Sequence, residues 1–230
     1  MRKGDVKKQK ILKTAEEMFC RKGYVETSVQ DILDALNTSK GSFYHHYPSK
    51  DALLAEICGQ RAEAGSELTF EKIQENQTAI QSLNILLSGM IPLNGEKLMF
   101  LLMLLPVFDM PEGVQVRHAY KRELSRVFVP KIAEVIRKGT EDESFCCPNP
   151  DFAAETLALL VNEFWSRTCD IIIENEKKGV LADAGELLAT ADAYRLVIER
   201  MIYARYGSVG LISLNELEAL TEQIHLHWKK

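Results

Sequence analysis

The stretch TSVQDILDALNTSKGSFYHHYPSK, residues 27–50, decides the fold, because it predicts two short helices and the start of a third. Its first part carries apolar residues at helical spacing on one face, namely Val29, Ile32, Leu33 and Leu36. We expect Thr27 to cap this helix, and Gln30, three residues later, fits the pattern of a capping box. The stretch therefore begins with a short amphipathic helix.

A second short helix follows a break at Asn37. Either Thr38 or Ser39 can cap it, and its pattern runs for about two turns, over residues 40–47. Pro48 ends the helix, because proline lacks an amide hydrogen and disfavours helical backbone in the residue before it. The third helix therefore starts afresh beyond this proline.

Two short helices joined by a turn of three to four residues form a helix-turn-helix, whose second helix lies in the major groove of DNA. Gly41 and Ser42 are small and allow that helix to approach a duplex closely. Donors and acceptors for phosphates and base edges come from Ser39, Lys40, Ser42, Tyr44, His45 and His46. Phe43 and Tyr47, four residues apart, are expected to point into a small core. The alternative is a helical pair with a solvated polar face, since the same periodicity is typical of both.

The net charge of the chain is −5, but it is unevenly distributed. Residues 1–50 contain ten Lys and Arg and six Asp and Glu, which gives +4, whereas the remaining residues carry −9. Because phosphates respond to the local field, the basic N-terminal part suits nucleic acid despite the acidic total. The alternative is a solubilising basic tail. The five cations of the first ten residues are enough to form one.

Residues 6–57 resemble the DNA-binding domain of the TetR-type (tetracycline-repressor-like) regulators. The matching positions are Ile11-Leu12, Ala15, Phe19, Lys22-Gly23-Tyr24, Thr27-Ser28-Val29, Ile32, Ser39 to Tyr47, and Ser49 to Leu54. Two positions depart from the family pattern: Tyr47 stands where phenylalanine is commoner, and Asn37-Thr38 replaces a small apolar residue followed by a glycine or similar. The resemblance implies an all-α protein with a helix-turn-helix DNA-binding domain at 1–49, a connecting helix at 50–68, and a larger helical effector-binding and dimerisation domain at 69–230.

The resemblance also implies which residues contact DNA. Lys50, which Ser49 precedes as a cap, is expected to hold a phosphate together with the amides of its helix. Lys40 and Tyr44 are expected mainly on phosphates, and base edges are assigned to Ser42, His45 and His46. The full predicted set is Thr27, Ser28, Thr38, Ser39, Lys40, Gly41, Ser42, Tyr44, His45, His46 and Lys50.

Helical patterns fill the rest of the chain. A basic arm of residues 1–5, predicted to be disordered, precedes a helix at 6–22, and further helices are predicted at 70–89, 96–108, 114–137, 151–178, 187–206 and 213–228. Breaks separate some of them at 91–95 and 109–113. Ser213 and Glu216 form a capping box for the last helix, which either packs on its own domain or extends a contact with a second copy.

By resemblance, the helices at 151–178 and 187–206 pair with their copies in a second subunit and make a homodimer. The alternative is that both are ordinary core helices, although their apolar positions lie on more than one face. Such a dimer carries two helix-turn-helix domains, called reading heads below. When they lie one helical turn of DNA apart, or a multiple of it, they match a pseudo-palindromic operator in double-stranded DNA.

Members of the family usually bind a small molecule inside the larger domain, and this binding releases the operator. Aromatic and methionine side chains with a few polar ones line such cavities. The candidates are Met99, Met103, Phe108, Tyr120, Phe128, Asn162, Trp165 and Cys169. For each of them the alternative is a place in the plain core. No charged constellation indicates the ligand, so an apolar or aromatic effector is favoured.

Several other classes are disfavoured. The longest apolar run, 98–108, is far shorter than the ~20 residues of a membrane span, and no secretory signal follows Met1. Five scattered cysteines indicate reduced thiols in a cytoplasmic protein, with a redox pair at Cys146-Cys147 as the alternative. His225 and His227 are two apart and cannot share a metal on a helix. No nucleophile elbow, phosphate loop or zinc signature is present, so we expect no enzyme, no cofactor and no metal. A helical protein-interaction module without sequence-specific DNA binding remains the alternative function.

Overall fold

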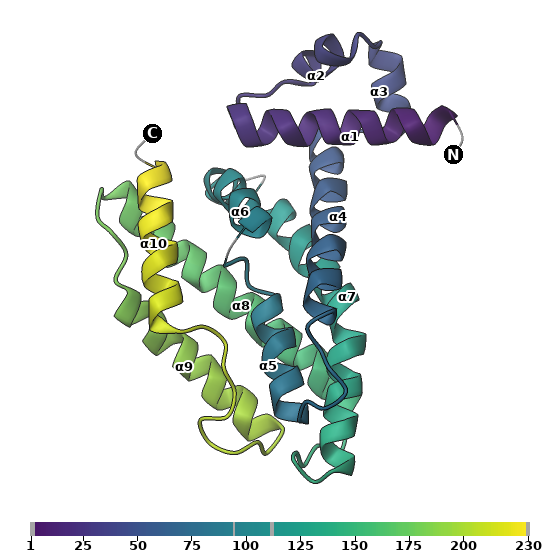
Figure 1. Cartoon of the computed structure of the whole chain (residues 1–230). Coiled ribbons are helices and arrows are strands. Elements are labelled where there is room, and N and C mark those ends of the chain that lie inside the picture. Colours follow the sequence, from purple (N-terminus) through teal and green to yellow (C-terminus); the bar gives the residue numbers. More distant parts are fainter. Residues whose placement is uncertain (1–2, 94, 111–112, 229–230) are drawn as a thin grey trace. The chain divides into compact units, whose positions relative to one another are not determined.

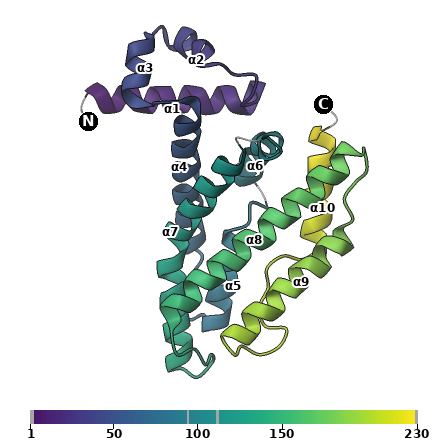
Figure 2. The same cartoon turned by 180° about the vertical axis from the view of Figure 1, so that it is seen from behind.

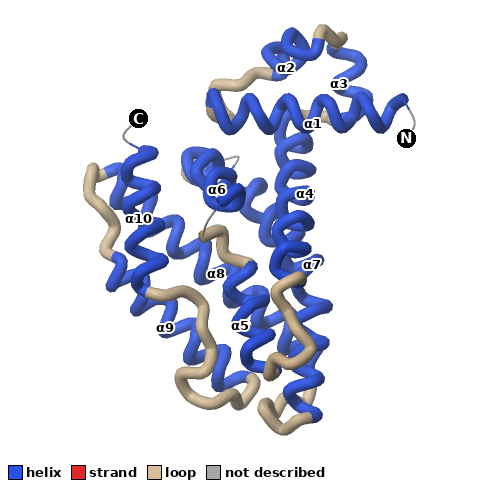
Figure 3. The backbone as a smooth tube through the Cα atoms, in the orientation of Figure 1, coloured by secondary structure: helices blue, strands red, loops and turns tan. Residues whose placement is uncertain are grey.

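The computed structural model describes residues 3–93, 95–110 and 113–228, and all regular structure in this part of the chain is α-helical (Figure 3). The all-α prediction is confirmed. Asn94, Pro111 and Glu112, which fall in the two predicted breaks, and Arg2 of the predicted basic arm lie outside the described residues. No described helix combines the length with the apolar character that a membrane crossing demands.

The chain divides into two compact units, Met1–Ala62 with Asn94–Glu123, and Glu63–Leu93 with Leu124–Lys230. The first unit holds α1 (Lys3–Lys22), α2 (Val29–Leu36), α3 (Lys40–His46), most of α4 (Lys50–Phe70), α6 (Gly95–Phe108) and the start of α7 (Gly113–Glu141). The division differs from the expected boundaries because α6 packs against α1 within the first unit.

A small core holds the first unit together. α2 and α3 lie on the same side of α1 in both Figure 1 and Figure 2. The fully buried side chains come from each helix of this group, namely Ile11, Ala15 and Phe19, then Ile32, then Phe43, then Leu53, Leu54 and Ile57. Tyr47 is also buried and its ring lies 6.0 Å from that of Phe43, so the prediction that both residues point into the core is confirmed.

The second unit is built around α8 (Pro150–Lys177), which contacts both α9 (Ala184–Met201) and α10 (Leu214–Trp228). It also contains the ends of α4 and α7 and the short helix α5 (Ala79–Gly89). α10 packs on α9 and α8 of its own unit, which is one of the two roles that the sequence left open. The predicted capping box at its start is confirmed, because Glu216 accepts bonds from the amide (2.8 Å) and hydroxyl (2.6 Å) of Ser213.

Some predicted helix ends were wrong. α1 begins at Lys3, inside the arm that was expected to be disordered. α9 begins after Asp183, whose side chain accepts the Glu186 amide, and ends at Met201 rather than near residue 206. Tyr203 has a left-handed backbone (φ 53°), which no helix interior accommodates. The connector that follows is then held by Asn84 of α5, which bonds Ser208 and Gly210.

Candidate nucleic-acid interface

The start of α2 is fixed by Ser28 and not, as the sequence predicted, by Thr27. Ser28 Oγ accepts the Asp31 amide (3.1 Å), and Asp31 Oδ2 accepts the Ser28 amide (2.7 Å). Lys22 of α1 joins this capping box through an ion pair to the same carboxylate oxygen (3.0 Å). These bonds lower the pKa of Asp31 to about 2, chiefly through the Ser28 amide, then the Ser28 hydroxyl and Lys22.

The turn between α2 and α3 is three residues long. Asn37 adopts a left-handed conformation (φ 47°), and its amide and that of Thr38 close the end of α2 on backbone carbonyls. Ser39 then caps α3, because its hydroxyl accepts the Ser42 amide (3.4 Å). Of the two caps that the sequence allowed, the structure uses Ser39. The result is a helix-turn-helix with α3 as its second helix.

α3 separates its apolar and polar residues onto opposite sides. Phe43 faces the core, whereas Tyr44 is 52% exposed. The polar residues of the predicted DNA-binding set are exposed at Ser39, Lys40, Tyr44 and His45, and half-buried at Thr38, Ser42 and His46. The rings of His45 and His46 meet edge to face, 5.0 Å apart. α3 therefore exposes a short polar face, while its apolar side packs into the core.

Gly41 contributes open space to this surface. It is exposed on α3, and a Cβ built on it would meet no atom within 4 Å. The fold therefore does not need glycine at this position, either for its backbone conformation or for packing. An unfilled place on an exposed helix face suits close approach by another molecule.

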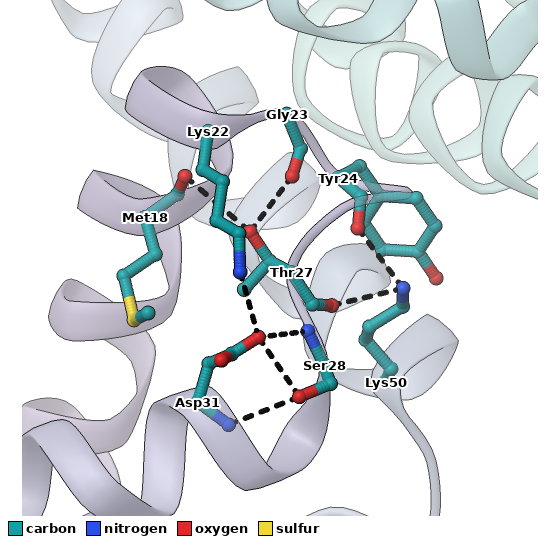
Figure 4. A network of polar contacts seen from close by, with 8 residues as sticks. All are labelled: Met18, Lys22, Gly23, Tyr24, Thr27, Ser28, Asp31 and Lys50. Carbon is teal, nitrogen blue, oxygen red and sulfur yellow. Dashed lines mark hydrogen bonds and ion pairs between the residues drawn. The ribbon is translucent and has the colours of Figure 1, made fainter.

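The corner between α1 and α2 forms a polar network around Thr27 and Lys50 (Figure 4). Thr27 is fully buried, and its hydroxyl donates to the Gly23 carbonyl (2.7 Å). Lys50 Nζ donates to the carbonyls of Tyr24 (2.9 Å) and Thr27 (3.1 Å). The Thr27 side chain is therefore not at the surface, and the Lys50 ammonium already has acceptors inside the protein.

The cations of α1 fall into two groups. Lys8 pairs with Glu56 of α4 (2.8 Å), whereas Lys7 and Lys10 are exposed. Lys7 and Lys10 line a hollow of about 370 Å³ between α1 and the turn, together with Val6, Ile11, Leu36, Asn37 and Thr38. Exposed positive charge therefore lies beside the helix-turn-helix, within the basic N-terminal part of the chain.

The eight candidate effector residues are split between the two units. Met99, Met103, Phe108 and Tyr120 belong to the first unit, and Phe128, Asn162, Trp165 and Cys169 to the second. Met99 is 58% exposed, whereas the others are buried or half-buried. In the second unit, Asn162 donates to Ser125 (3.1 Å) and the ring of Phe128 packs against Phe70. The predicted set did not include Ser125 and Phe70, because both contacts join helices that are far apart in the chain.

The five cysteines are free thiols, and they include the buried Cys58 and the exposed Cys146. Burial raises the pKa of the Cys58 thiol to about 12, so it stays protonated. Within the described residues, no group of three or more His, Cys, Asp or Glu side chains is arranged to hold a metal ion.

The sequence model of the family described as "Bacterial regulatory proteins, tetR family" matches residues 11–57, which run from α1 into α4. Residues 11–57 therefore match the TetR-type DNA-binding domain in sequence. A curated relative from Bacillus subtilis, named as the uncharacterised HTH-type transcriptional regulator YerO, is 44% identical over 52 residues, or 23% of this chain and 18% of that protein. The match thus spans about a fifth of that relative's length and lies in the TetR-type head.

Solved structures extend the likeness to the whole fold. RolR in complex with resorcinol superposes with a TM-score of 0.60 at 12% identity, covering 95% of this chain and 94% of that one. A putative transcriptional regulator from Saccharomonospora viridis in complex with choline gives a TM-score of 0.52 at 21% identity, covering 85% and 96%. At these identities the likeness shows a shared fold alone. It does not extend to the ligands of those proteins.

Proposed function

We propose that this protein is a DNA-binding transcriptional regulator whose α3 lies in the major groove. The observation that carries the proposal is the short polar face of α3, mounted on buried Phe43 and Tyr47. Lys40 and Tyr44 contact mainly phosphates, and Ser42, His45 and His46 reach base edges. Ser28, Thr38, Ser39 and Gly41 complete the contact surface, whereas the burial of Thr27 removes its side chain from it.

The working form is a homodimer through α8 and α9. Both helices expose large apolar side chains although their other faces are buried, and these are Phe152 and Leu159 on α8 and Leu196 and Val197 on α9. Such a surface favours a partner of the same kind. Two heads held by one dimer bind a pseudo-palindromic operator far more tightly than one head alone.

The regulator acts as a repressor that a small molecule releases from its operator. Two proteins of similar fold are known in complex with small molecules, resorcinol in RolR and choline in the Saccharomonospora viridis protein. The effector site is formed by the predicted residues of the second unit, Phe128, Asn162, Trp165 and Cys169, and Phe128 and Trp165 favour an apolar or aromatic ligand. Screening small molecules for release of bound DNA identifies the effector.

The experiment that tests DNA reading begins with selection of bound sequences from a random duplex pool. We expect one pseudo-palindromic sequence to be enriched, with an affinity that falls steeply as salt rises. Lys40→Met should reduce the slope of log affinity against log salt by about one. Lys72→Met, at an exposed position in the second unit, is the matched control and should leave affinity and slope unchanged.

A second arm tests the reading helix itself. Exchanging residues 39–46 for those of another family member should change the enriched sequence while the protein keeps its oligomeric state. An unchanged site preference would refute α3 as the reader. Absent or salt-insensitive DNA binding by the unaltered protein would instead favour a protein-interaction module.

A further inference from the structure

Lys50, the first residue of α4, reaches back across 26 and 23 residues to the corner between α1 and α2. Its ammonium donates to the carbonyl oxygens of Tyr24 (2.9 Å) and Thr27 (3.1 Å) and lies 4.1 Å from the centroid of the Tyr24 ring. In Figure 4 both dashed lines converge on this one nitrogen. Two carbonyls and a ring face therefore share the charge of a single side chain.

The corner that Lys50 holds is itself closed by short-range bonds. The Thr27 amide donates to the Tyr24 carbonyl (3.3 Å), and the Thr27 hydroxyl donates to that of Gly23 (2.7 Å). Asp51, next to Lys50, accepts the Tyr24 hydroxyl. Tyr24 and Thr27 are both buried, so the corner is packed in one arrangement. Two adjacent residues of α4, Lys50 and Asp51, hydrogen-bond to this corner.

We infer that Lys50 is a positioning residue that fixes the α1–α2 corner on α4 and thereby sets the orientation of α3, and that it is not primarily a phosphate ligand. The corner ends at Ser28, where α2 begins, and α3 follows α2 through a three-residue turn. An error in the angle of the corner therefore displaces every base-reading side chain at once. The inference rests on the proposed function only for its DNA readout.

The two roles of Lys50 predict different results. A phosphate ligand adds affinity for every duplex and contributes to the salt slope. A positioning residue adds discrimination, because base contacts need register whereas non-specific backbone contacts tolerate small displacements. Replacing a positioning residue also makes the corner open more easily in the DNA-free protein. Replacing a surface phosphate ligand has no such effect.

The test compares Lys50→Met with Lys40→Met, since each change removes one ammonium and retains an unbranched stem. Hydrogen exchange is followed in the DNA-free protein at the amides of Gly23, Thr27 and Ser28, all of which are hydrogen-bonded. Affinity is then measured against salt for the selected operator and for random duplex.

For Lys50→Met we expect exchange at these three amides to accelerate by about tenfold or more, as local opening becomes easier. The ratio of operator affinity to random-duplex affinity should fall by about tenfold, with the salt slope on random duplex unchanged. Lys40→Met should leave the exchange unchanged and reduce the slope.

Unchanged exchange at the corner in Lys50→Met would overturn the inference. So would a salt slope lowered by about one with the affinity ratio intact, which is the result for a phosphate ligand. If the unaltered protein bound no DNA, the proposed function would fail while the exchange measurement would still decide whether Lys50 holds the corner. Tyr24→Phe, which removes the hydroxyl that donates to Asp51, provides a milder variant should Lys50→Met not fold.

Discussion

At the residue scale, Gly41 is a position where folding does not require glycine but the proposed DNA binding does. Its backbone is helical and its surroundings are open, so an added methyl group meets nothing within the protein. Glycine costs a helix stability relative to alanine, because more backbone freedom is lost on folding. Under the proposed function, the open space at Gly41 is the place that a DNA backbone or base edge occupies.

We therefore predict that Gly41→Ala raises the stability of the free protein by roughly 0.5 kcal/mol while weakening operator binding by about tenfold or more. Denaturant unfolding and fluorescence anisotropy with labelled operator measure the two effects. Gly59→Ala in α4 is the control, because its new methyl group would make only ordinary contact with Glu123 and lies away from α3. Undiminished operator affinity in Gly41→Ala would show that DNA does not approach this position.

Asp31 gives a pH-dependent prediction at the same scale. Its folded-state pKa is about 2, below the ordinary 3.8, mainly because the Ser28 amide donates to the carboxylate. A depressed pKa means that the carboxylate adds stability above pH 3.8, and that this contribution is lost as the pH falls through about 2. The difference in unfolding free energy between the unaltered protein and Asp31→Asn should thus be constant near neutral pH and shrink below pH 4. A difference that does not vary with pH would contradict the capping role of the charge.

At the scale of elements, one buried pair attaches the last helix. Glu176 of α8 is buried, and its two carboxylate oxygens lie 3.0 Å and 2.9 Å from Nδ1 of His225 on α10. A buried carboxylate that loses its hydrogen-bond partner keeps the full cost of leaving water. The pair therefore makes α10 depend on α8 and not only on its apolar face.

Replacing His225 by alanine should destabilise the protein by about 1–3 kcal/mol, because Glu176 is then buried without this partner. Adding Glu176→Leu to that variant should restore part of the loss, since an apolar pair leaves no unsatisfied group. Urea unfolding of the two single variants and the double variant, as a double-mutant cycle, measures the coupling. Strictly additive effects would rule out the pair as the link between the helices.

At the scale of the whole molecule, the proposed dimer rests on the exposed apolar residues of α8 and α9. Val197 is 51% exposed on α9, next to the exposed Leu196. A charge placed in such a surface would be removed from water on dimerisation without a partner. Assembly, and with it the pairing of two reading heads, therefore depends on this face remaining apolar.

Val197→Glu should convert the dimer to a monomer in sedimentation velocity. The operator affinity should fall by a factor of about 10² or more, because one head binds without its twin. Leu68→Glu on α4, which is 62% exposed, introduces the same charge elsewhere and should change neither property. A Val197→Glu protein that remains dimeric would place the interface on another surface.

The amino-acid sequence by itself determined the all-α class, the helix-turn-helix and the TetR-type match of residues 11–57, because these depend on local spacing. Periodicity located Phe43 and Tyr47 in the core, and turn residues such as Asn37 and Pro48 bounded α3, which the structure confirmed. Each of these signals lies within a few residues of the position it explains.

Only the tertiary structure decided which of two neighbouring caps is used and where long side chains end. The sequence predicted Thr27 as the cap of α2, but Thr27 is buried at its own corner and Ser28 is the cap, whereas of Thr38 and Ser39 the structure uses Ser39 for α3. The partners of Lys50 are carbonyls more than twenty residues away, and His225 meets Glu176 across 49 residues. Side-chain identity sets what a group can bind, but contacts at such separations exist only once packing has brought the helices together, so no local pattern encodes them.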